Sequence, residues 1–92
     1  MMNFGSIEVV EQQGLTKMPQ KAASAWATFD GSMVGADYKP IAYVGSQLVK
    51  GTNYVFLAEQ TLITANTERH IVAVTVNEFN GNYSVVNIER II

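Results

Sequence analysis

The fold follows from the segment Gln47-Leu48-Val49-Lys50-Gly51, which lies between two extended apolar runs. The first run is Ile41-Ala42-Tyr43-Val44, and the second is Tyr54-Val55-Phe56-Leu57-Ala58. A glycine between two strand-like runs is typical of a tight reversal, because glycine reaches positive φ without a Cβ clash. The sequence therefore predicts a β-hairpin with Gly51 near its tip.

A second hairpin is predicted at Asn80-Gly81, between the strand-like segments Arg69–Phe79 and Tyr83–Ile92. A type I′ turn needs positive φ at both central residues, and Asn-Gly is the dipeptide that most favours it. In Arg69–Phe79 neither alternating set of side chains is polar throughout. We therefore expect this strand to lie in the interior of the sheet.

Upstream of the first hairpin, an alanine-rich segment predicts one helix. We expect Thr16 to cap it, Pro19 to lie in its first turn and Asp30-Gly31-Ser32 to end it. Apolar residues of this segment that are spaced four and three apart share one face of the helix, and this face can pack on a sheet. The residues of this face are Met18, Ala22, Trp26 and Phe29.

Ser6–Glu11 is short and rich in β-branched residues, and it predicts a first strand before the helix. Gly45-Ser46 interrupts the strand that leads to the first hairpin and predicts a bulge. The order is then strand, helix and four strands joined by short turns, which force antiparallel neighbours. The 92 residues predict a single α+β domain over 1–92, with one helix packed on an antiparallel sheet of four to five strands.

The letters Gln47-x-Val49-x-Gly51, continued by Thr52-Asn53-Tyr54, resemble the first inhibitory hairpin of the cystatins. This family consists of protein inhibitors of papain-like cysteine proteases. The predicted order of elements also matches the cystatin fold, a sheet wrapped around one helix that follows the first strand. The lack of cysteine looks most like the stefin branch, whose members are cytosolic and have no disulfides.

The resemblance implies a three-part wedge that fills the protease cleft and offers no cleavable peptide bond. Gln47–Gly51, including Leu48 and Lys50, would form its centre. Phe4 and Gly5 would form the N-terminal arm, and Asn80 and Gly81 the second hairpin. Lys50 stands where the family usually has a small residue, and the second hairpin lacks the family's Pro-Trp.

Composition argues against several other functions. Six Lys and Arg residues and a net charge of −2 do not make the basic face that nucleic acid requires. The chain has no cysteine and one histidine, and it lacks a phosphate loop and a nucleophile elbow, so we expect no metal, no cofactor and no enzymatic activity. No apolar run approaches the ~20 residues of a membrane helix. The N-terminus shows no signal peptide, which predicts a cytoplasmic protein.

Two alternatives stay open, because the same letters also suit a hairpin with an unrelated role. A non-inhibitory binding module would need a cavity between helix and sheet. A self-assembly module would need an exposed sheet edge, for which the apolar segment Ile88–Ile92 is the candidate. An inhibitor would need exposed hairpin tips clustered at one end of the sheet, and it could be a monomer or a homodimer.

Overall fold

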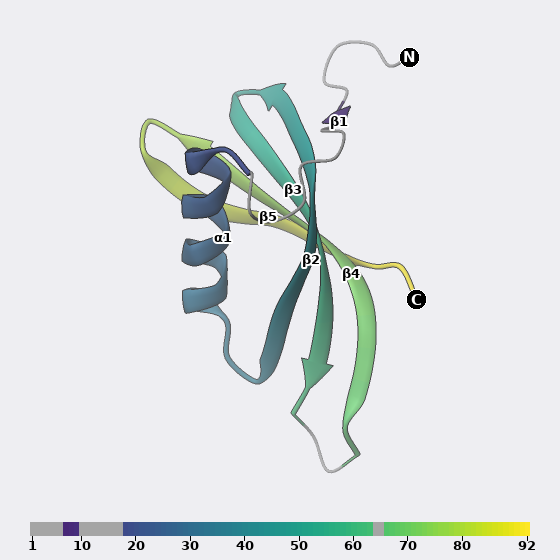
Figure 1. The fold of residues 1–92 in the computed structure, drawn as a ribbon. Helices are drawn as coiled ribbons and strands as arrows, with labels where there is room; N and C mark the ends of the chain where they lie inside the picture. Colours follow the sequence, from purple (N-terminus) through teal and green to yellow (C-terminus); the bar gives the residue numbers. More distant parts are fainter. Residues whose placement is uncertain (1–6, 10–17, 64–65) are drawn as a thin grey trace.

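The computed structural model describes residues 7–9, 18–63 and 66–92. One helix packs on a five-stranded antiparallel sheet whose strands lie side by side in chain order (Figure 1). The fold class predicted from the sequence, α+β with a cystatin-like arrangement, is therefore confirmed. The elements are β1(Ile7–Val9), α1(Gln20–Ser32), β2(Ala36–Val49), β3(Gly51–Leu62), β4(Glu68–Phe79) and β5(Asn82–Arg90).

The strands β2 to β5 form a meander of hairpins. Val49 lies opposite Gly51 at the first tip, and Phe79 lies opposite Asn82 at the second. β4 pairs with β3 on one side and with β5 on the other, which confirms its predicted interior position. Its side chains at Val72, Val74 and Val76 are buried under the helix.

The helix begins later than the sequence predicted. Its first residue is Gln20, and Pro19 is the N-cap rather than a residue of the first turn. Pro19 is extended, with ψ of 152°, and its carbonyl accepts the N–H of Ala23 at 3.0 Å. Proline disfavours the α conformation in the residue before it, so the helix cannot continue upstream through Met18. The predicted cap, Thr16, lies outside the described residues; the predicted end at Ser32 is confirmed.

Aromatic rings form the centre of the core between α1 and the sheet. Trp26 lies between Phe29 and Phe56, with ring centroids 5.1 and 5.3 Å away. Tyr38 and Tyr43 of β2 extend this cluster, at 4.9 Å from Phe29 and 5.6 Å from Phe56 respectively. The tilted and edge-to-face geometries are those that aromatic quadrupoles favour. The predicted helix face therefore does pack on the sheet.

Bulges interrupt the sheet where its strands bend. The register of β2 against β3 shifts between Pro40 and Ala42 and again between Tyr43 and Gly45, the second close to the predicted bulge. Bulges increase the local right-handed twist. In the resulting twisted sheet, the β2–β3 and β4–β5 tips lie at the end where α1 begins (Figure 1). No helix in the described part of the chain is long and apolar enough to cross a membrane.

Candidate functional site

Two hairpin tips lie together at one end of the molecule. Seven of their residues form what we call the tip surface: Leu48, Val49, Lys50, Gly51, Phe79, Asn80 and Gly81. Among the described residues, the structure thus brings together the two hairpins that the sequence predicted as parts of one site. Phe4 and Gly5 of the predicted N-terminal arm lie outside the described residues, and β1 places its first residue, Ile7, opposite Gln47.

The first tip is tight and depends on Gly51. Lys50 alone separates β2 from β3, and Gly51 has a φ of +83°. A Cβ at this position would overlap the backbone carbonyl oxygen of Glu78 and come within 3.0 Å of Phe79 Cβ. Glycine is therefore required for two reasons, the left-handed backbone and the close approach of β4. The second reason was not visible in the sequence.

Three polar side chains tie this tip to the strands beneath it. The Asn77 side-chain amide donates to the Lys50 carbonyl at 3.1 Å and to Asn53 Oδ1 at 3.0 Å. Asn53 in turn donates to Gln47 Oε1 at 3.2 Å. The three residues lie opposite one another in β2, β3 and β4. We call this set, Gln47, Asn53 and Asn77, the amide ladder.

The amide ladder gives Gln47 a structural role, whereas the resemblance to cystatins implied only a contact with the protease. Asn53 is only 9% exposed, so its amide needs partners inside the protein. Sequence reasoning missed Asn53 and Asn77. Asparagine is depleted in strands, so Asn77 inside the predicted strand Arg69–Phe79 was a usable signal, whereas Asn53 preceded the strand predicted from Tyr54. Their pairing was not predictable, because it depends on the register between β3 and β4.

The second tip has the predicted turn. Asn80 and Gly81 have φ of 52° and 81°, as a type I′ turn requires. The Gly81 N–H donates to Glu78 Oε2 at 2.8 Å. A carboxylate that accepts a backbone N–H makes a stronger bond than a neutral acceptor. The turn is therefore held both by its backbone preference and by Glu78.

The tip surface combines apolar side chains with a cation. Leu48 is 68% exposed and Phe79 is 40% exposed. Lys50 Nζ lies 5.5 Å from the centroid of the Phe79 ring, within the range of a cation–π attraction. Exposed apolar residues gathered at protruding tips are typical of a contact surface.

Tyr54 lies in the core just below the first tip. Burial raises the pKa of its phenol, and the charges of Glu78, Tyr43 and Tyr83 raise it further, against a lowering hydrogen bond from Thr52. Burial also raises the pKa of Tyr43. Both phenols are therefore neutral at physiological pH and contribute as apolar rings with a polar end. Neither is an acid–base group for catalysis near neutral pH.

The lone histidine lies away from the tip surface. His70 Nε2 is 3.2 Å from Glu68 Oε1, and Nδ1 is 3.2 Å from the Ile92 carbonyl oxygen. The His70 side chain is 12% exposed and has a polar partner at each ring nitrogen, as expected for a satisfied histidine at a strand start. Within residues 7–9, 18–63 and 66–92, no group of three or more acidic or histidine side chains is placed to hold a metal ion.

A cavity of about 210 Å³ opens between α1 and the β4–β5 hairpin. Pockets that bind drug-sized molecules are usually about 300–1,000 Å³. The cavity is below this range, so it gives little support to a small-molecule binding module. Its lining residues are Thr28, Phe29, Ser32, Val76, Tyr83, Ser84 and Val85.

Comparison of the chain with protein-family models, with curated proteins and with solved structures finds no match.

Proposed function

We propose that this protein is a reversible inhibitor of papain-like cysteine proteases and that its tip surface enters the active-site cleft. One observation carries the proposal. The two hairpin tips are joined at the same end of the sheet by the contact of Gly51 with Glu78 and Phe79. This is the arrangement that an inhibitory wedge requires, and it lies at the residues where the letters resemble the cystatins.

The proposed mechanism is steric. Leu48 and Phe79 would contact apolar walls of the cleft, and the two tight turns would block the nucleophile. The turns are already ordered by backbone preference and by the amide ladder, so they would lose little conformational entropy on binding. A turn fixed in this way also holds its peptide bonds away from the extended geometry that a protease cleaves.

The N-terminal arm of the wedge is part of the proposal. β1 pairs with β2 next to the first hairpin, with Ile7 opposite Gln47. Phe4 and Gly5 precede β1 by a few residues and would supply the third contact. The proposal includes no enzymatic activity and no cofactor, and it places the protein in the cytoplasm, with a monomer or a homodimer as the active species.

Titration of papain tests this function. A fixed amount of active papain is mixed with increasing amounts of the purified protein, and residual hydrolysis of a peptide substrate is measured. Inhibition that saturates near one-to-one, with the added chain intact on a gel, supports the wedge. Undiminished activity at high micromolar protein concentration, or cleavage of the chain as a substrate, contradicts general papain inhibition.

A second candidate function is self-assembly, and the edge of the sheet at β5 favours it. Val85, Val86 and Ile91 are all exposed along this edge. By contrast, the part of β2 that does not pair with β1 carries Lys39, Pro40 and a bulge, which natural sheets use to prevent pairing. Light scattering over a hundredfold range of protein concentration tests this candidate, because assembly through β5 requires a mass that rises with concentration.

A further inference from the structure

The side chain of Lys50 lies between the two hairpins. It is exposed at the first tip, and its Nζ is 5.5 Å from the centroid of the Phe79 ring at the second. The negative face of an aromatic ring attracts a cation. This attraction favours an ammonium position beside the Phe79 ring.

The backbone that carries this ammonium is fixed from below. Asn77 Nδ2 donates to the carbonyl oxygen of Lys50 at 3.1 Å. The next residue, Gly51, is seated against the Glu78 carbonyl. A charged group on a fixed backbone has less freedom to lose when it binds a partner. The backbone of Lys50 is therefore held in place, and the contact with the Phe79 ring favours one position of its ammonium.

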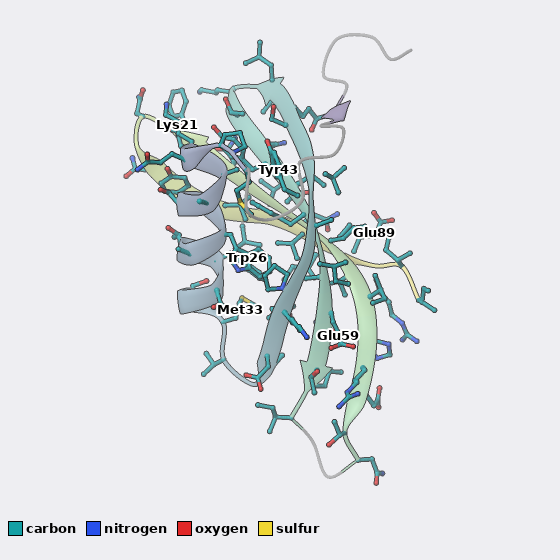
Figure 2. The ribbon with its side chains drawn as sticks, in the orientation of Figure 1. Lys21, Trp26, Met33, Tyr43, Glu59 and Glu89 are labelled. Carbon is teal, nitrogen blue, oxygen red and sulfur yellow. The ribbon has the colours of Figure 1, made fainter. Side chains whose placement is uncertain are left out.

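No carboxylate of the described side chains lies within ion-pair distance of Lys50 Nζ. Glu78 is close to the tips, but its Oε2 accepts the Gly81 N–H at 2.8 Å. Lys21, at the start of α1, adds a second cation at the same end of the molecule (Figure 2). Glu8 lies in β1 opposite Ser46 of β2. The other carboxylates of the described residues lie farther from the tips along their elements: Asp30, Asp37, Glu59, Glu68 and Glu89.

We propose that Lys50 selects the partner, and that the tip surface fits a protease cleft with a carboxylate beside an apolar recess. The recess would take Phe79, whose ring lies beside the Lys50 ammonium, and the carboxylate would face Lys50. This inference rests on the proposed inhibitory function and names the chemistry of its target. Complementary charges speed association, and an uncharged or basic cleft in the same place would be disfavoured.

Charge variants test the selection. The variants are K50E, K50A and K50R, with K39E as a control of equal charge change on an exposed lysine of β2 away from the tips. The probes are two papain-like proteases of known structure, one with carboxylates on the rim of its cleft and one with an uncharged rim. Association and dissociation rates are measured at low and high salt, and thermal melting confirms that each variant is folded.

We expect K50E to slow association with the acidic-rim protease by about tenfold or more. High salt should reduce this difference, because the Debye length shortens. K50A should show a smaller loss and K50R nearly none. K39E should bind as the unmodified protein does, and the uncharged-rim protease should not distinguish the Lys50 variants.

Equal binding of K50E and the unmodified protein to the acidic-rim protease would overturn the inference while inhibition itself stands. An equal loss of association rate in K39E would also overturn it. The rate would then depend on the net charge of the protein and not on the position of Lys50. Failure of the unmodified protein to inhibit either protease is a different result. It would remove the proposed function, and the selection by Lys50 with it.

Discussion

Gly51 of β3 packs directly against the backbone carbonyl of Glu78 on β4. A Cβ at position 51 would overlap that oxygen, and the φ of +83° already disfavours any other residue. The contact joins the first hairpin to the strand that leads into the second. The relative position of the two tips therefore depends on the absence of one side chain.

The substitution Gly51→Ala should damage both stability and the tip surface. The left-handed backbone costs an L-residue roughly 1–2 kcal/mol, and the overlap with the Glu78 carbonyl adds to it. We expect the free energy of unfolding, measured in urea, to fall by more than this backbone cost alone. Inhibition of papain should weaken further than the loss of folded protein explains, because the first tip has moved away from β4.

Gly81→Ala is the matched control for this prediction. Gly81 has nearly the same φ, +81°, but an added Cβ would meet nothing within 4 Å. It should therefore show the backbone cost without the overlap. Equal losses of stability in the two variants would contradict the account of the Gly51 contact.

Loss of the Asn77 amide should loosen the first tip. Asn77→Ala removes the donor to the Lys50 carbonyl and to Asn53 Oδ1. Asn53 is buried, and an unpaired buried polar group costs about 1–3 kcal/mol. Hydrogen exchange at the amides of Lys50 and Gly51 should become faster. Asn87→Ala, on the exposed strand β5, is the control and should change stability by no more than about 0.5 kcal/mol. Unchanged exchange at the tip would show that the amide ladder does not hold it.

The closeness of α1 to the sheet depends on small side chains. Ala25 is fully buried, whereas Ala27 of the same helix is exposed. Ala25→Leu overfills the interface and should lower the free energy of unfolding by roughly 1–3 kcal/mol. Ala27→Leu should be nearly neutral in the same urea titration. Similar results for both would mean that the helix packs more loosely than the buried alanine implies.

Alkaline pH should destabilise the fold through the buried tyrosines. Burial first, and the Glu78 charge second, raise the folded-state pKa of Tyr54 above its ordinary value of 10.0. The folded state therefore holds this proton more tightly than the unfolded state does. The resulting stability is complete below pH 10 and is lost as the pH rises through the folded-state pKa.

Thermal melting at a series of pH values between about pH 8 and pH 11 measures this loss. The melting temperature of the unmodified protein should fall at the alkaline end. The melting temperature of Tyr54→Phe should fall less steeply, because position 54 then has no phenol to ionise. Lysine deprotonation affects both proteins alike, so the difference between them isolates Tyr54. Parallel pH profiles would contradict the assignment.

The sequence could predict the hairpins and the helix face because these depend on local chemistry. Gly51 and Asn80-Gly81 mark turns that require positive φ. The apolar residues in both alternating sets of Arg69–Phe79 indicate a strand inside the sheet, with one face buried and the other half-buried. The start of the helix was wrong because Pro19 suits either the first turn or the position before it. Proline disfavours the helical conformation at Met18, and Pro19 itself is extended, with ψ of 152°, so the helix begins after it.

Most of what fixes the candidate site was not predictable from the letters. The hydrogen bond between Asn53 and Asn77 depends on the register between β3 and β4. The close approach of Gly51 to the Glu78 carbonyl depends on the twist that brings the strands together. Both are relations between residues distant in the chain. Only the tertiary structure could show that Gln47 belongs to a hydrogen-bonded ladder.

The most direct test of the central claim is the map of the surface that a papain-like protease touches. The isotope-labelled protein is titrated with papain whose active-site thiol has been blocked by a small group, and its backbone amide resonances are followed by NMR. The account predicts changes concentrated at Leu48, Lys50, Phe79 and Asn80, with little effect along β5. No change at saturating papain, or changes confined to β5, would contradict a wedge formed by the tip surface.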